Sequence, residues 1–478
     1  MEPADNIKRR GASGARQALR ERWNAASGYR EVLTLAWPLV ISTGSISVQH
    51  FVDRMFLNWH STDEFTAAFP AGILSFSVIS FFLGTGGYVN TFVSQYFGAK
   101  RYDRIGVSLW QSIYFSIFSG LAMLAFIPFA GILFERIGHD AQLVKLETEY
   151  FRIALLGGGF VVANGALSGF FTGVNKPMIP LYCNVASTAA NVLLTWIFVF
   201  GKFGAPELGL KGAAWATVSS VIFQTCLYAA LTATRHYREK YSTLRTWRLD
   251  TALLIRLLRF GLPSGVQFTL DISSFALFIA LIGRLGRLEL ASTNMAMQIN
   301  MLAFLPMVGF GIATSTLVGR GLGANRPDLA DKATWSALHM TFSYMAAISV
   351  AYVLVPLLFI LPFRPADPEE ILHFEQIKPL AIILLRYVAV YSLFDTLNII
   401  FSSALKGAGD TRFVMNTSLV CGWLLLVTPT YCVIHFEIGG LYMVWLFLAL
   451  NVVTLGFCFF LRFIRGPWRG MRVIEQEN

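Results

Sequence analysis

Three carboxylates stand inside long apolar stretches of the sequence: Asp53, Asp271 and Asp395. A charged side chain at mid-depth in a bilayer costs ~3 kcal/mol or more, so such residues usually face a water-filled cavity or a partner. Two carboxylates with neutral oxygen ligands suit Na⁺, whereas a carboxylate in apolar surroundings can exchange H⁺ near neutral pH. The three acids are therefore candidates for cation coupling, with Asp271 and Asp395 as candidate Na⁺ ligands, and the residue types leave both ions open.

Polar side chains accompany two of these acids at helical spacing. Residues three or four positions apart share one face of a helix. The neighbours are Gln267 and Ser274 for Asp271, and Tyr391 and Asn398 for Asp395. We expect two polar stripes on otherwise apolar helices. Asp53 differs because Arg54 follows it directly, so a local ion pair between these two residues is the alternative to a role in coupling.

Four amides form a further set of candidates. Asn184 and Asn191 are two helical turns apart on one predicted helix, and Asn294 and Gln298 share a face of another. Buried amides in membrane bundles more often join helices than bind ligands. Support of an ion or substrate site and the joining of helices both remain open for these four residues.

The elements that would position these side chains are membrane-spanning helices. Of the 478 residues, 55% are hydrophobic and 14% are charged, a composition far from that of a soluble domain. Segments of about 20 or more mainly apolar residues can cross a bilayer. They lie at 32–58, 66–92, 106–134, 150–172, 178–200, 210–234, 252–282, 289–318, 333–361, 379–404, 413–434 and 439–462. The sequence predicts an all-α polytopic membrane protein with twelve transmembrane helices.

The twelve segments form two copies of six. When Pro38 is aligned with Pro263, VSQYFGAKRYD at 93–103 falls on VGRGLGANRPD at 318–328 without a gap. An even number of helices per copy gives both copies the same orientation, so we expect two six-helix bundles related by a parallel internal repeat, with a substrate site between them near mid-membrane. The glycines of the repeated motif are expected to end helices, because no strand precedes them as a phosphate-binding loop would require.

The charge distribution predicts the topology. The organisation we expect is a basic N-terminal segment at 1–30, a first lobe at 31–235, a linker at 236–250, a second lobe at 251–464 and a tail at 465–478. Most of the 38 lysine and arginine residues lie in the termini and the even-numbered connections, which the positive-inside rule assigns to the cytoplasm. Both termini are therefore expected in the cytoplasm at a bacterial-type inner membrane. The net charge of +10 is attributed to topology and to contact with anionic lipid rather than to nucleic acid.

Together these features resemble the multidrug and toxic compound extrusion (MATE) family from about residue 30 to 465. The resemblance rests on Ala-Trp-Pro38, Phe51-Val-Asp53, the motif at 93–103, the stretch from Gly261-Leu-Pro263 to Asp271, and Tyr391-x3-Asp395 followed by Leu405-Lys406-Gly407. It implies a two-lobe secondary active antiporter that exports organic cations and drugs in exchange for Na⁺ or H⁺ by alternating access. It further implies a protein that is not an enzyme, has no cofactor and functions as a monomer.

The resemblance also implies roles at matching positions. Asp53 matches the acid of the first helix of the family, and Asp395 matches the acid of the tenth helix in its NorM-like branch. Asp271 stands where that branch usually has Glu. Asn191 matches an asparagine of the fifth helix, whereas Thr195 stands where the DinF-like branch has a second acid in the first lobe. A cation site in the second lobe, built from Asp271 and Asp395, is the implied arrangement.

Two other functions remain open from the sequence. A flippase for lipid-linked saccharides can share the two-lobe architecture, but it commonly needs a strongly cationic cavity, and few arginines occupy mid-helix positions here. A membrane-embedded enzyme that modifies lipids would ordinarily need clustered acidic, histidine or metal-binding motifs, whereas the three acids lie on separate predicted helices. Export of small organic cations is the favoured hypothesis.

Overall fold

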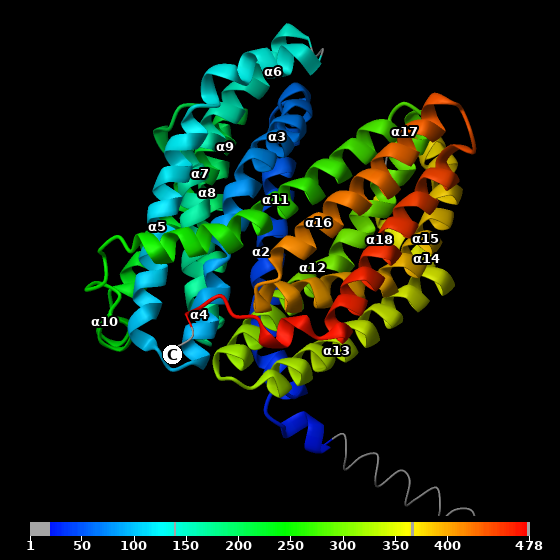
Figure 1. Cartoon of the computed structure of the whole chain (residues 1–478). Coiled ribbons are helices and arrows are strands. Elements are labelled where there is room, and N and C mark those ends of the chain that lie inside the picture. Colours follow the sequence, from blue (N-terminus) through cyan, green and yellow to red (C-terminus); the bar gives the residue numbers. More distant parts are fainter. Residues whose placement is uncertain (1–19, 138–139, 365–367, 476–478) are drawn as a thin grey trace, which may run out of the picture.

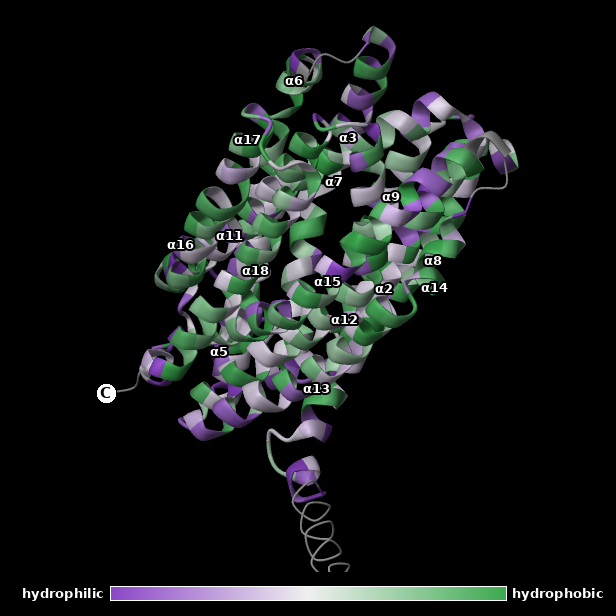
Figure 2. Cartoon of the chain, turned by 90° about the vertical axis from the view of Figure 1, so that its right-hand side faces the viewer, coloured by the Kyte–Doolittle hydropathy of each residue, from purple (hydrophilic) through white to green (hydrophobic). Residues whose placement is uncertain are grey.

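The computed structural model describes residues 20–137, 140–364 and 368–475. Twelve helical segments within this part are long and apolar enough to cross a membrane, which confirms the all-helical membrane fold predicted from the sequence. Hydrophobic residues dominate the middle of the helices, and hydrophilic residues gather towards their ends (Figure 2). Most of the predicted N-terminal segment and residues 476–478 of the predicted tail lie outside the described residues.

The first half of the chain forms one bundle. Its helices are α2 (Tyr29–His60), α3 (Thr62–Gly86), α4 (Val89–Gly98), α5 (Tyr102–Leu124), α6 (Ala130–Ile137), α7 (Ala141–Gly173), α8 (Met178–Phe200) and α9 (Leu210–Thr232), followed by the short α10 (Arg235–Tyr241). Two predicted segments are interrupted. The second divides between α3 and α4, and the third divides between α5 and α6 at the 3-10 turn Ile127–Phe129, where Pro128 lacks the N–H that a continuous helix needs.

The second half forms the other bundle. Its helices are α11 (Thr251–Ile282), α12 (Arg287–Gly323), α13 (Pro327–Leu354), α14 (Pro356–Ile360), α15 (Pro368–Ala408), α16 (Thr411–Cys421), α17 (Thr428–His435) and α18 (Gly440–Arg465). The eleventh predicted segment is not one regular helix, because a π-helical stretch, Gly422–Val427, separates α16 from α17. Pro429 explains this irregularity, since a proline ring clashes with the carbonyl four residues earlier.

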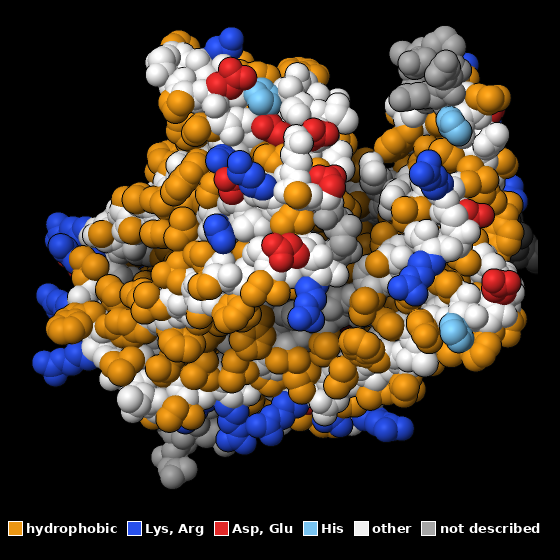
Figure 3. Space-filling model, turned by 90° about the horizontal axis from the view of Figure 1, so that it is seen from above, with side chains coloured by type: hydrophobic (Ala, Val, Ile, Leu, Met, Phe, Trp, Pro, Cys, Tyr) orange, Lys and Arg blue, Asp and Glu red, His pale blue; other side chains and the backbone are white. Residues whose placement is uncertain are grey.

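The two bundles meet at one end and diverge at the other (Figure 1). At the diverging end, here named the open end, the surface is hollowed between them (Figure 3). Both described ends of the chain lie at the opposite, closed end (Figure 1). Two long helices contact both bundles: α2 packs against α8 and α12, and α11 packs against α3 and α16.

The repeated motif lies at the closed end. Gly98 ends α4 and Gly323 ends α12, as the sequence predicted. A Cβ atom added at Gly98 would overlap the carbonyl oxygen of Arg320, and one added at Gly323 would overlap the carbonyl oxygen of Gln95. The two copies of the motif therefore pack backbone to backbone, an approach that glycine permits. We name this contact between α4 and α12 the interlobe seal.

Candidate cation and substrate site

Asp271 lies in the middle of α11, and its side chain is exposed. Its carboxylate accepts a hydrogen bond from the amide of Gln267, one turn earlier, and Gln267 itself is only 9% exposed. Ser274 instead donates to the carbonyl of Leu270 in its own helix, as serine in a helix commonly does. Of the two predicted neighbours, Gln267 therefore contacts Asp271 and Ser274 is engaged with the backbone.

Asp395 lies on α15 with 7% of its surface exposed, and it accepts a hydrogen bond from Asn398 Nδ2 at 2.9 Å. Tyr391, one turn earlier, is 4% exposed, and its hydroxyl accepts a hydrogen bond from Asn300 Nδ2 of α12 at 3.3 Å. Tyr391 thus joins α15 to α12 beside the acid. Asn300 was not among the candidates from the sequence. The one feature that could have suggested it is a polar residue inside an apolar segment.

The two acids of the second bundle lie on different helices, Asp271 on α11 and Asp395 on α15. A cation placed between two such carboxylates is stabilised by both charges.

Lys406, which was not among the candidates from the sequence, contacts the partner of Asp271. Lys406 donates from Nζ to Gln267 Oε1 at 3.3 Å, and Gln267 donates in turn to Asp271. The tenth predicted segment ended at 404, whereas α15 continues to Ala408, so Lys406 appeared to lie in a loop. A signal was present, because Lys406 follows Asp395 by about three helical turns and so faces the same side of α15.

Asp53 has different surroundings in the first bundle. It lies on α2 and accepts a hydrogen bond from the Thr195 hydroxyl of α8 at 2.7 Å. The Arg54 guanidinium instead lies 5.1 Å from the centre of the Phe69 ring. Adjacent helical residues do not face each other, and the described residues show no local ion pair between Asp53 and Arg54. Thr195, noted from the sequence only as a departure from a family pattern, is therefore the direct partner of Asp53.

Asn184 joins three helices of the first bundle. Its amide donates to the Ser42 hydroxyl of α2, and its carbonyl oxygen accepts a hydrogen bond from Gln224 of α9. Gln224 in turn accepts a hydrogen bond from Asn164 of α7 at 3.0 Å. Within this bundle Asn184 has the helix-joining position that was the alternative to a site role.

The other candidate amides are placed differently. Asn191 is fully buried and faces Thr217 Oγ1 at 3.4 Å, while its Oδ1 has no hydrogen-bond partner among the described residues. Asn294 and Gln298 are exposed on α12. Among the described residues, no hydrogen bond links these three amides to Asp271 or to Asp395.

Comparison with known proteins identifies the family. The family model described as MatE matches residues 38–197 and 263–432, and the two matches begin at Pro38 and Pro263, the prolines that the sequence repeat aligns. The chain belongs to the MATE family. Its members are ion-coupled, multi-pass membrane transporters for multidrug efflux, and they are not enzymes, which excludes the lipid-modifying enzyme.

Relatives of this MATE protein extend over most of its length. It is 28% identical over 426 residues to a probable multidrug resistance protein NorM of Brucella suis biovar 1, covering 87% of this chain and 88% of that protein. It is 26% identical over 443 residues to a probable multidrug resistance protein NorM of Bradyrhizobium diazoefficiens, covering 92% and 93%.

Solved structures share the fold of this MATE protein. The outward-facing conformation of a multidrug resistance MATE family transporter of the MOP superfamily has a TM-score of 0.82 at 20% identity and covers 93% of this chain and 97% of that chain. The crystal structure of a MATE protein in the bent conformation has a TM-score of 0.81 at 20% identity, with coverage of 94% and 96%.

Proposed function

We propose that this MATE transporter exports small organic cations in exchange for Na⁺ or H⁺ bound at Asp271 and Asp395. The observation that carries the proposal is the exposed carboxylate of Asp271 in the middle of a membrane-spanning helix. An ionisable group at this depth is a functional-site candidate by default. Asp395 of α15 adds a second carboxylate within a membrane-spanning helix of the same bundle.

The closed end is assigned to the cytoplasm in this proposal. Both described chain ends lie there (Figure 1), and the basic α10 belongs to the linker between the bundles. Basic connections favour the cytoplasmic side. The structure then corresponds to an outward-open state, in which Asp271 is accessible from outside the cell.

Aromatic side chains support an organic cation as the substrate. Phe76 of α3 and Phe268 of α11 meet edge to face between the two bundles, with ring centres 6.1 Å apart. Phe268 lies three positions before Asp271, so the aromatic ring and the carboxylate share one face of α11. Aromatic faces attract cations, and the acid supplies charge. A lipid-linked saccharide carries phosphate, and a carboxylate at this position disfavours it.

Exchange follows from competition in an alternating-access cycle. A cation that binds Asp271 and Asp395 from outside favours release of the organic cation, because both need the same negative charge. Substrate arriving from the cytoplasm favours release of the coupling cation for the same reason. Each ligand shifts the conformational equilibrium only by its difference in affinity for the two states.

Proteoliposomes test this proposal. Ethidium export is measured under a Na⁺ gradient alone and under a pH gradient alone, for the wild type and for Asp271→Asn and Asp395→Asn. Both variants are expected to lose most gradient-driven export, whereas Glu239→Gln, in the exposed pair with Arg235, retains it. Export by both aspartate variants at the wild-type rate would falsify the site assignment.

A further inference from the structure

Lys406 places a basic side chain beside the proposed cation site. Its side-chain nitrogen donates a hydrogen bond to Gln267, the residue that donates to Asp271. A basic residue in a membrane-spanning helix is costly and commonly functional. Its half-buried side chain extends towards Asp395, because helical side chains lean towards the N-terminus of their helix.

The backbone of the same residue belongs to the contact between the bundles. The Tyr88 hydroxyl donates to the carbonyl oxygen of Lys406 at 2.6 Å, and Gln95 Nε2 donates to the carbonyl oxygen of Gly407 at 3.0 Å. Both donors come from the first bundle, and Tyr88 is 6% and Gln95 0% exposed. Carbonyl groups in the last turn of a helix have no N–H donor within that helix. The first bundle supplies them here.

We propose that Lys406 is a positioning residue that links occupancy of the cation site to closure of the cytoplasmic end; this inference rests on the proposed function. In the present conformation its ammonium group balances Asp271 through Gln267. A coupling cation at Asp271 competes with that ammonium group, because both are drawn to the same carboxylate. Release of the ammonium group loosens the end of α15, where Tyr88 holds the chain, and so favours separation of the bundles. Opening to the cytoplasm then follows cation binding.

Charge-removing and charge-retaining variants test this role. In proteoliposomes, Lys406→Gln is expected to raise the apparent affinity for the coupling cation about tenfold and to permit cation flux without drug. Lys406→Arg keeps the positive charge and is expected to restore coupling. Gln267→Ala removes the bridge while both charges remain, so drug-independent flux is expected there as well, which keeps the test independent of the folding of Lys406→Gln. Unchanged cation affinity and tight coupling in the variants that fold would overturn the inference.

Asp271→Asn, measured in parallel, separates this inference from the proposed function. Loss of cation dependence in Asp271→Asn together with wild-type behaviour of Lys406→Gln would contradict the role of Lys406 alone. Wild-type cation affinity in Asp271→Asn would contradict the cation site itself, and with it the inference.

The chain segment after α18 contacts both bundles at the closed end. Trp468 is fully buried, and its ring lies 4.7 Å from that of Phe463. The chain then crosses to the first bundle, where the Val473 N–H donates to Gln95 Oε1 at 2.9 Å. The described part of this basic tail packs on protein, because burial of Trp468 and Val473 draws it onto the closed end.

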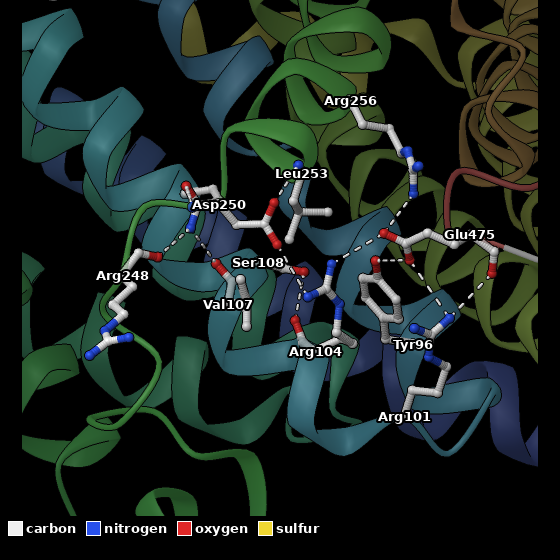
Figure 4. Close-up of polar contacts among 11 residues, drawn as sticks. Tyr96, Arg101, Arg104, Val107, Ser108, Arg248, Asp250, Leu253, Arg256 and Glu475 are labelled. Carbon is white, nitrogen blue, oxygen red and sulfur yellow. Dashed lines mark hydrogen bonds and ion pairs between the residues drawn. The ribbon is translucent and has the colours of Figure 1, made fainter. Parts of the chain in front are cut away.

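Glu475 ends the described tail in a basic pocket (Figure 4). Its carboxylate accepts a hydrogen bond from the Tyr96 hydroxyl at 2.6 Å and from Arg104 Nη2 at 3.2 Å, and lies 2.7 Å from Arg256 Nη1. Arg101 Nη1 donates to the main-chain oxygen of Glu475 at 3.3 Å. Burial alone would raise the pKa of Glu475, but the Tyr96 hydrogen bond and the charges of Arg256 and Arg104 lower it to about 2.

We infer that the tail, residues 466–475, is a latch that holds the closed end shut. It begins in the second bundle and binds Tyr96 and Arg104 of the first, so separation of α4 from α12 requires Glu475 to leave its pocket or the tail to unpack around Trp468. In the register of the internal repeat, Arg104 aligns with Leu329 and Tyr96 with Gly321. The second copy therefore lacks the residues that form this pocket.

Distance measurements between spin labels test the latch. Labels are placed at Ala99→Cys and Ala324→Cys, beside the interlobe seal, after replacement of the exposed Cys226 and Cys432 by serine. Glu475→Gln is expected to increase the separated population several-fold. Arg472→Gln is the matched control, because Arg472 donates within the tail, to Arg469 and Met471. Identical distance distributions for Glu475→Gln and the wild type would overturn the latch.

Discussion

The acids of the two bundles differ in what they contact. In the first bundle, Asp53 is held by the neutral hydroxyl of Thr195. In the second, Asp271 is connected through Gln267 to the cationic Lys406. A neutral partner leaves the acid free to gain or lose a proton without displacing another charge, whereas a nearby cation competes with any ion that binds.

The internal repeat shows where this difference arose. In the register that aligns Pro38 with Pro263, Asp53 falls on Phe278 and Asp271 falls on Ile46. The glycines that end α4 and α12, by contrast, align with each other and pack across the interlobe seal. Duplication therefore accounts for the scaffold and its closed end, and the charged sites lie where the two copies have diverged.

The largest expected effect separates the two bundles directly. Asp271→Asn should lower gradient-driven ethidium export about 100-fold, because it removes a charge that both ligands need. Asp53→Asn should lower export less, about tenfold or below, because Asp53 does not contact the pair in the second bundle. Initial export rates in proteoliposomes of equal protein content measure both. A larger loss in Asp53→Asn would reverse the comparison.

The next effect concerns the seal that the two copies share. Gly323→Ala adds a methyl group against a backbone carbonyl that cannot rotate away, so we expect it to destabilise the closed end by about 1–3 kcal/mol. Gly72→Ala is the control, because a Cβ atom at Gly72 meets nothing within 4 Å. Thermal unfolding in detergent compares the variants. Equal melting temperatures would show that the backbone contact does not constrain the seal.

A smaller effect is expected at the partner of Asp53. Thr195→Val keeps the shape and removes the hydroxyl donor, which should cost about 1 kcal/mol of stability. Cation-dependent export should persist, because Asp271 and Asp395 are untouched. The melting temperature and the apparent cation affinity are measured on the same preparation. A change in apparent cation affinity as large as that in Asp271→Asn would place Thr195 in the coupling site.

The smallest effect is expected from a change of pH, which acts on Glu475 in the tail. The pKa of Glu475 is about 2, below its ordinary value of 4.5. The stabilisation by its ionised contacts is therefore complete above pH 4.5 and is lost as the pH falls through about 2. Between pH 7 and pH 5 the label distance across the seal should stay constant in the wild type. A wild-type distance that lengthens in this range, with no change in Glu475→Gln, would contradict the depressed pKa.

Prediction from the sequence succeeded for features that depend on local sequence patterns. Apolar length predicted the twelve spans, and the repeated glycines predicted the ends of α4 and α12. It failed for irregular helices, such as the break between α16 and α17, because an apolar count does not register the effect of Pro429 on the backbone. It also missed Lys406, because α15 continues beyond the apolar segment.

The sequence by itself determined the membrane helices, the duplication and the three acids that lie within spans. Each span must satisfy its own backbone hydrogen bonds in lipid, so length and apolar composition suffice to identify it. Only the tertiary structure decided the contacts between residues far apart in the chain. Lys406 and Gln267 are 139 residues apart in the chain, and Glu475 and Arg104 are 371 residues apart. Contacts at such separations depend on how whole helices pack, which no local pattern encodes.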